Sequence, residues 1–161
     1  MDPVRPTPPY GAYAAIMGTF VGGLAAAGGL ARALRRDAYC NTPLDLAVLG
    51  LASFKAARTI TRDEVSSFIR DPVVEGTAHE GGEEPVATGD FRQALGELVT
   101  CSRCIGTWAA AGLTATQIIA PRFGRLLTWS LASAGANDWL QAGFAALTHK
   151  SNELEQRTSA E

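Results

Sequence analysis

The sequence contains little cysteine, little histidine and no excess of basic residues. Three cysteines and two histidines are spread over 161 residues. Three cysteines are too few for the disulfide framework of a small secreted protein. The 14 Lys and Arg residues are balanced by 16 Asp and Glu residues, which gives a net charge of −2. This balance excludes a generally basic protein that coats nucleic acid, so no nucleic-acid partner is expected.

Charge is absent from two long stretches, residues 10–31 and 105–120, and scarce in two others, at residues 44–60 and 126–147. A membrane-spanning helix needs about 20 mostly apolar residues. We therefore predict an all-α integral membrane helical bundle with about four transmembrane helices at these positions. A soluble amphipathic helix is the alternative for residues 44–60. A cleaved signal peptide is the alternative for residues 10–31, but there the basic cluster follows the apolar run instead of preceding it.

A polar insert, residues 61–100, separates the second predicted span from the third. It opens with Thr61 and Glu64 in the spacing of a capping box, and its Gly-, Glu- and Pro-rich centre is typical of a solvated loop. Asp90 then precedes an apolar-faced segment, residues 91–99, which predicts one amphipathic helix at the membrane interface. Ordinary packing of this helix on the bundle is equally compatible with the pattern. The domain organisation expected is an N-terminal arm and helix (1–43), a membrane domain (44–148) and a polar, frayed tail (149–161).

Four spans would place both termini and the insert on the same side of the membrane. That side would collect nine Lys and Arg residues, whereas the two turns on the other side carry five. The positive-inside rule then favours a multi-pass protein of the cell membrane, with the insert 61–100 and both termini in the cytoplasm. The lipid bilayer is the first partner that this arrangement implies.

Small residues recur along one face of the first predicted span. Gly11, Ala15, Gly18 and Gly22 follow one another at intervals of four, three and four residues. In lipid, small side chains let helices approach closely, and close packing drives their association. We predict that this helix-packing face binds a second copy of the chain or another membrane protein.

Two charged residues within the apolar stretches predict a buried ion pair. Asp138 is the thirteenth residue of the fourth span, about 18 Å along the helix, and Lys55 lies at a depth of about 16–17 Å in the second. An intramembrane charge is costly and tends to find a partner, so we expect Lys55 and Asp138 to meet. Further candidates for this charge cluster are Arg58 and Asn137. A structural clamp is favoured over a proton or substrate relay, and a small transporter centred on Asp138 is the corresponding functional hypothesis.

Cys101 and Cys104 form a Cys-x-x-Cys pair just before the third predicted span. A helix N-terminus favours the thiolate of the first cysteine, which suits a membrane thiol-disulfide oxidoreductase with Cys101 as nucleophile. A zinc site needs about four ligands, so Cys101 and Cys104 would have to be joined by others such as His79 and His149. Packing of small side chains is the third hypothesis, and we favour it. No cofactor is expected unless zinc binds here.

The segment "LGELVTCSRCIGTW", residues 95–108, carries a resemblance to a known family. Its Gly-Glu-Leu, Cys-x-x-Cys and Gly-x-Trp elements resemble, in order and spacing, the bacterial membrane family called domain of unknown function 1360. The similarity covers roughly residues 44–148. The residues that match the motif are Gly96, Glu97, Cys101, Cys104, Gly106 and Trp108.

This resemblance implies a small bacterial integral membrane protein with no established activity, and some family members are linked to sporulation. Members typically have three spans, so residues 1–43 would be an added N-terminal helix. The function that we predict is a non-enzymatic scaffold or accessory subunit that associates through Gly/Ala helix faces. The thiol oxidoreductase and the transporter are the alternatives.

Overall fold

The computed structural model describes residues 8–36, 42–76 and 82–158, and within these ranges the chain is mainly helical. The helical elements are α1 (Tyr10–Ala33), α2 (Pro43–Arg62), the 3-10 turn η1 (Glu64–Ser66), α3 (Ser67–Arg70), α4 (Phe91–Thr100), α5 (Ser102–Ile119) and α6 (Pro121–Thr158). The strands β1 (Val74–Glu75) and β2 (Glu84–Pro85) are short. The predicted all-α class is therefore confirmed for the described residues.

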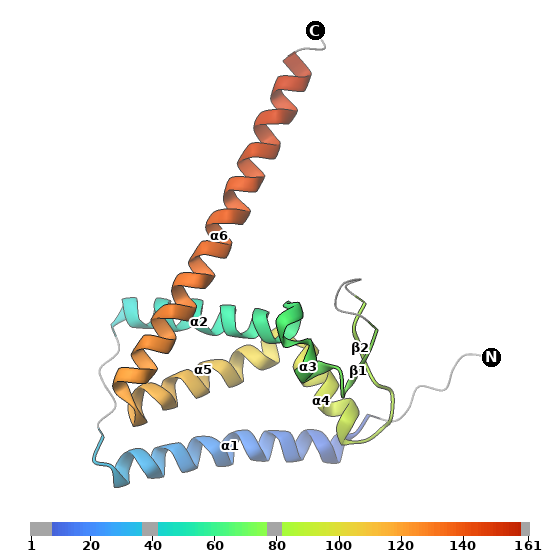
Figure 1. Cartoon of the computed structure of the whole chain (residues 1–161). Helices are drawn as coiled ribbons and strands as arrows, with labels where there is room; N and C mark the ends of the chain where they lie inside the picture. The colour runs from blue at the N-terminus through green and yellow to red at the C-terminus, as the bar shows by residue number, and fades with distance from the viewer. Residues whose placement is uncertain (1–7, 37–41, 77–81, 159–161) are drawn as a thin grey trace, which may run out of the picture.

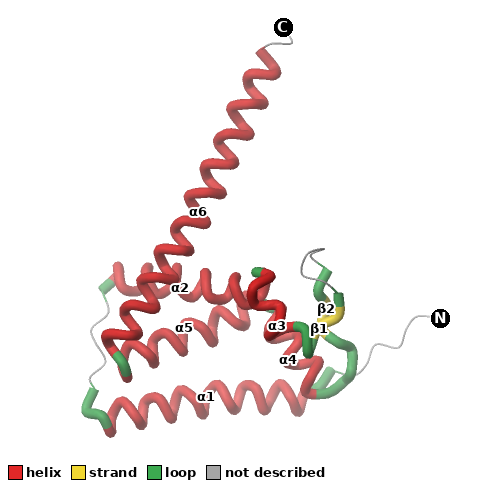
Figure 2. Tube along the Cα trace, viewed as in Figure 1, coloured by secondary structure: helices red, strands yellow, loops and turns green. Residues whose placement is uncertain are grey.

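Helices α1, α5 and α2 lie side by side, with α5 between the other two (Figure 1). Helix α6 turns back at the far end of α5, crosses α2 and then projects away from the bundle (Figure 1). The two short strands and helices α3 and α4 gather at the opposite end, as the colouring by secondary structure in Figure 2 shows.

The core lies where α2, α5 and α6 meet, and small residues form it. Ala52, Leu113 and Ala132 are buried together, one from each helix. On α6 the buried residues are Gly124, Thr128, Ala132 and Gly135. Their spacing of three or four residues puts them on one face. A Cβ at Gly135 would lie 3.0 Å from the Leu51 carbonyl oxygen, so glycine allows α6 to approach the α2 backbone closely.

Helix α6 is longer than the sequence predicted. The fourth span was expected to end at Leu147 and the tail to fray, but the helix continues without a break to Thr158. Side-chain pairs one turn apart support this polar extension. Lys150 Nζ lies 3.0 Å from Glu153 Oε2, and Arg157 pairs with the same glutamate. The prediction of a frayed tail is wrong for residues 149–158.

The capping box lies at the start of α2 and not at the start of the insert, where it was predicted. Thr61 does not begin a helix; it is buried in the last turn of α2, which ends at Arg62. The box is formed instead by Thr42 and Asp45, where the Thr42 N–H donates to Asp45 Oδ2 at 3.0 Å and the Asp45 N–H donates back to Thr42 Oγ1. Pro43 at the first helical position has no N–H to satisfy, which suits this helix start.

The insert contains more ordered structure than a solvated loop. Strands β1 and β2 pair antiparallel, with Val74 opposite Pro85. Beside them, Arg70 is completely buried, and its guanidinium forms a two-pronged ion pair with Glu83, with Nε 2.8 Å from Oε2 and Nη2 3.1 Å from Oε1. Arg70 Nη1 also donates to the carbonyl oxygens of Ile60 and Asp63 at the end of α2. One side chain thus fastens the insert to the bundle.

The amphipathic helix of the insert forms as predicted. Helix α4 begins at Phe91, and the Asp90 carboxylate caps it by accepting the Arg92 N–H at 2.9 Å. A hydrogen bond from the Thr88 hydroxyl, together with the one from the Arg92 N–H, holds the pKa of Asp90 below its ordinary value of 3.8. The position of α4 at a membrane interface stays a prediction.

One helix among those described, α1, is long and apolar enough to cross a membrane by length and composition. Helices α2, α5 and α6 cover the other three predicted spans, but polar residues interrupt their apolar character. In α2 these residues are Asp45, Lys55, Arg58 and Arg62. A bundle with four spans therefore stays a prediction.

Candidate functional site

The residues of the Cys-x-x-Cys motif lie where α4 joins α5. Gly96 and Glu97 are in the second half of α4, Cys101 is the single residue between the helices, and Cys104 follows in the first turn of α5. Gly106 and Trp108 lie one turn further on, and a Cβ at Gly106 would be 3.8 Å from Ala57 on α2. The motif residues therefore lie close to α1, α2 and the insert.

Gly96 allows the insert to pack on α4. A Cβ at this position would lie 2.4 Å from the Val73 carbonyl oxygen and 3.1 Å from Pro85 Cβ, so any larger side chain would push β1 and β2 away. Gly96 is buried, as is its neighbour Ala94 on the same helix. The requirement for glycine here is one of close approach between backbones.

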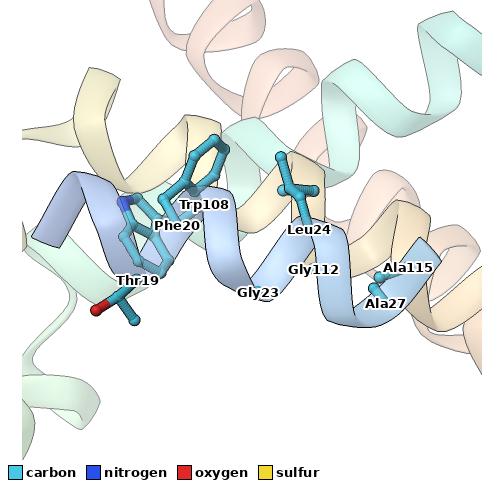
Figure 3. Close-up of a pocket in the computed structure, with 9 residues that line it drawn as sticks. Thr19, Phe20, Gly23, Leu24, Ala27, Trp108, Gly112 and Ala115 are labelled. Atoms are coloured by element: carbon cyan, nitrogen blue, oxygen red, sulfur yellow. The ribbon is translucent and has the colours of Figure 1, made fainter. Parts of the chain in front are cut away.

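Glu97 and Trp108 hold α1 against the rest of the chain. The Tyr13 hydroxyl donates a hydrogen bond to Glu97 Oε2. The ring of Phe20 packs edge-on against the Trp108 ring, with centroids 5.0 Å apart. A cavity of about 160 Å³ lies between α1 and α5 beside these two rings, and Figure 3 shows Gly23, Gly112 and Ala115 along it. Two motif residues thus make the docking site for the N-terminal helix.

Cys101 and Cys104 form a pair at the N-terminus of α5. Their Cα atoms are 5.3 Å apart, within the range that a disulfide spans. Cys101 is the N-cap of α5, and the Cys104 N–H points at its sulfur with an N–S distance of 3.3 Å. Cys101 is half-buried and Cys104 is exposed. A thiolate at Cys101 would be stabilised by this N–H and by the helix N-terminus, so the pair has the geometry for thiol-disulfide exchange.

The described residues do not assemble a metal site around this pair. No group of three or more His, Cys, Asp or Glu residues that could hold a metal ion occurs among them. His149 lies on the projecting part of α6, and His79 is outside the described residues. Zinc at Cys101 and Cys104 stays a prediction whose further ligands would have to come from elsewhere.

Lys55 and Asp138, predicted to meet, are in direct contact. Lys55 Nζ lies 2.9 Å from Asp138 Oδ2, and the two side chains are 19% and 32% exposed. A second carboxylate, Asp63 at the end of α2, lies 3.8 Å from the same ammonium group. Sequence reasoning missed it because Asp63 was assigned to the insert. Among the described residues neither Arg58 nor Asn137 joins the pair by a hydrogen bond or ion pair, although both were candidates.

The predicted packing face of α1 is exposed. Gly11, Ala15, Gly18 and Gly22 all face away from the bundle, and a Cβ added at any of the three glycines would meet nothing within 4 Å. Tyr13 and Phe20, which lie on another face of α1, make a hydrogen bond and a ring contact with the rest of the chain. Its use in association with another chain stays a prediction.

The family described as "Protein of unknown function (DUF1360)" matches residues 48–144, which is more than half of the chain and includes the whole cysteine motif. Two relatives from Bacillus subtilis (strain 168) are similar. "Sporulation protein YjcA" is 30% identical over 117 residues, which cover 61% of this chain and 95% of the relative. "UPF0713 protein YngL" is 30% identical over 104 residues, which cover 61% of this chain and 76% of the relative. No solved structure matches the chain. The matched segment, with the junction motif inside it, shows that the chain belongs to the DUF1360 family.

Proposed function

We propose that the chain is a multi-pass membrane protein that acts as a non-enzymatic scaffold or accessory subunit. The observation that supports this is the size of its surface. The accessible area is 11467 Å² for a chain of 16.9 kDa, whereas a folded water-soluble monomer of this mass exposes about 7,700 Å². The excess is surface that a compact soluble fold of this mass would bury.

The side chains on that surface support an apolar covering. On the projecting part of α6, Trp139, Leu140, Phe144 and Leu147 are 64%, 72%, 73% and 73% exposed. Large apolar side chains also stand exposed on α1, α2 and the start of α6. Contiguous exposed apolar surface is rare on soluble monomers and marks membrane or protein contact. Lipid around the helices and a partner on α6 would together cover it.

A scaffold role fits the way α6 is built. Its first half is packed on α2 through the small residues of the core, and its second half is exposed at every position except Glu153. The apolar part of that half, up to Leu147, is suited to packing against a helix of another protein. One relative is named a sporulation protein, and we propose that the assembly served by this chain belongs to the same process.

A photo-crosslinking residue placed at Phe144 tests the scaffold role in cells that express the full chain. We expect discrete protein adducts from Phe144, because this position is exposed on the free part of α6. Leu131 is the matched control, since it packs against the buried cluster of Ala52, Leu113 and Ala132 and should give only crosslinks within the chain. Crosslinking of Phe144 to lipid alone would contradict the scaffold role but would agree with a membrane location.

Membrane topology is tested by cysteine accessibility in intact cells. Single cysteines are introduced near Glu83 and Leu154 in a variant without native cysteines, and both are reacted with an impermeant maleimide. Four spans with the insert and termini in the cytoplasm predict no labelling at either site until the cells are opened. Labelling of one site but not the other in intact cells would contradict an even number of spans between them.

A second candidate is a membrane thiol-disulfide oxidoreductase, which the geometry at Cys101 and Cys104 favours. The Cys101 thiolate would attack a disulfide of a partner protein and form a mixed disulfide. The Cys104 thiolate would then attack the Cys101 sulfur, releasing the partner as a dithiol and leaving the pair oxidised. Alkylation of the purified chain, read by mass with and without reductant, tests this. A pair that stays reduced in the native membrane and reacts no faster than an ordinary thiol would eliminate it.

A further inference from the structure

The groove between α2 and the first turns of α5 encloses a cavity of about 540 Å³ and is lined by three arginines. Arg58 and Arg62 are one turn apart on α2 and therefore share a face of that helix. Arg103 comes from the first turn of α5. We call this the arginine groove. It is separate from the Lys55–Asp138 pair and from the contacts that hold α1.

Among the described residues, none of the three guanidinium groups, those of Arg58, Arg62 and Arg103, is neutralised by an ion pair. Guanidinium groups bind phosphate and carboxylate oxygens through paired N–H donors. Three exposed guanidinium groups around one cavity give it a positive potential, so the groove favours a ligand with concentrated negative charge.

A buried hydroxyl in the groove supports the same conclusion independently. Thr61 is 3% exposed, and its Oγ1 has no hydrogen-bond partner among the described residues. Leaving a buried polar group unpaired costs roughly 1–3 kcal/mol, so such a group usually has a partner. Because Thr61 lines the groove beside Arg58 and Arg62, a ligand oxygen there would accept the missing hydrogen bond.

The N-terminus of α5 adds further donors. The first N–H groups of a helix have no partner within the helix and carry partial positive charge. Ser102 and Arg103, the first two residues of α5, both line the groove. Phosphate groups bind at helix N-termini for this reason.

The groove is apolar at its other end, where Gly50, Phe54 and Ala57 line it. A ligand that fills it would carry an anionic group at the arginine end and could lay a hydrocarbon portion along α2. We propose that the arginine groove binds a phosphate group, supplied either by the head of an anionic phospholipid or by a soluble phosphate compound. This assignment goes beyond the scaffold role and does not depend on the number of membrane spans.

The test uses the full chain purified in a neutral detergent. Native mass spectrometry counts bound phosphatidylglycerol and phosphatidylcholine, and inorganic phosphate is added as a competitor. A second measurement follows the midpoint of thermal unfolding in phosphate and in chloride at equal ionic strength. We expect one phosphatidylglycerol per chain, bound at least about tenfold more tightly than phosphatidylcholine.

Two variants and one control connect this binding to the groove. Replacing Arg58 and Arg62 together by Gln should weaken phosphatidylglycerol binding about tenfold or more. Thr61→Val should weaken it several-fold, yet without ligand its unfolding midpoint should equal or exceed that of the wild type, because no buried hydroxyl is left unpaired. The control is the double change of Arg122 and Arg125 to Gln at the start of α6, which removes the same charge at the other end of the bundle.

The outcomes separate the two sources. Preferential phosphatidylglycerol binding that inorganic phosphate does not displace supports a lipid headgroup. A phosphate-dependent rise in the unfolding midpoint, lost in the Arg58 and Arg62 variant and without any preference among lipids, supports a soluble phosphate compound. The proposal is overturned if the wild type shows neither effect, or if the control variant loses binding as much as the groove variant. Unchanged binding by the Thr61→Val variant would overturn the role of that hydroxyl.

Discussion

At the scale of single residues, Lys55 stands between two carboxylates, at 2.9 Å from Asp138 and 3.8 Å from Asp63. Asp138→Asn removes the nearer charge and leaves the ammonium group with the more distant one. We expect a loss of about 1–3 kcal/mol of unfolding free energy, between the values for exposed and for buried pairs. Lys55→Met alone should lower the unfolding free energy by a similar amount, because it leaves the Asp138 carboxylate without its cationic partner.

A double-mutant cycle in detergent, followed by chemical unfolding, measures the coupling of this pair. The variant with both Lys55→Met and Asp138→Asn should be more stable than the sum of the single changes predicts, since no charge is left without a partner. Simple additivity of the two losses would show that the contact contributes nothing to the fold.

Gly96 provides a second residue-scale prediction, because the space around it is filled by backbone. Gly96→Ala brings a Cβ to 2.4 Å from the Val73 carbonyl oxygen, so we expect a loss of about 1–3 kcal/mol and a displaced insert. Gly112→Ala is the control, since nothing lies within 4 Å of a Cβ there and alanine favours helix by up to about 1 kcal/mol. Unfolding midpoints of the two variants should shift in opposite directions. A neutral Gly96→Ala would contradict the close packing of α4 on the insert.

At the scale of elements, Arg70 joins α3, the end of α2 and the strand pair. Arg70→Met leaves Glu83 without its partner and frees the carbonyl groups of Ile60 and Asp63. Breaking a buried, hydrogen-bonded pair in this way typically costs about 3–5 kcal/mol. Hydrogen exchange should accelerate in residues 64–75 far more than in α5. Arg122→Met, which removes an exposed arginine at the start of α6, should leave that exchange nearly unchanged.

Helix α4 should respond to acid through its N-cap. The pKa of Asp90 is lowered in the folded chain by hydrogen bonds from Thr88 and Arg92, so the stability it contributes is present above 3.8, the pKa of the free group. That contribution is lost as the pH falls below 3.8 and through the lower folded pKa. Exchange of the Arg92 amide should therefore rise below that pH in the wild type. In Asp90→Asn, whose amide caps without titrating, the rise should be absent, and its persistence would show that another group is responsible.

Helix positions followed well from the sequence because they depend on local patterns. Apolar runs located α1, α2, α5 and the first half of α6, and Asp90 before an apolar face located α4. The polar end of α6 was missed because its support comes from charged pairs around Glu153 and not from an apolar stripe. The pattern Thr61 to Glu64 suggested a helix start, yet α2 was still continuing there, and spacing alone does not distinguish the two cases.

Contacts between distant residues were harder to predict. The contact between Lys55 and Asp138 was predictable from their depths along two helices, because a regular helix rises by a known distance per residue. The Arg70–Glu83 pair had no such signal, since the strands β1 and β2 that bring its partners together are two residues long and show no alternation. The arginine groove likewise depends on how α2 packs on α5. Local sequence patterns do not predict that packing.

At the scale of the whole molecule, α1 is attached to the family domain by few contacts. Phe20→Ala together with Tyr13→Phe removes the ring contact to Trp108 and the hydrogen bond to Glu97. We expect α1 to detach while α2, α5 and α6 stay packed. In a chain where Trp129 and Trp139 are replaced by Phe, the emission of Trp108 should shift and become accessible to an aqueous or lipid-borne quencher. Unaltered Trp108 emission would show that other contacts hold α1.

The length of α6 has a mechanical consequence. A continuous helix of 38 residues extends about 57 Å, whereas the hydrocarbon layer of a bilayer is about 30 Å thick. In the proposed membrane arrangement, the charged turns beyond the apolar part of α6 stand clear of the lipid as a stiff rod and hold Thr158 away from its surface. A reporter fused there would be held away from the membrane, and shortening the rod by whole turns would lower it in steps of about 5.4 Å.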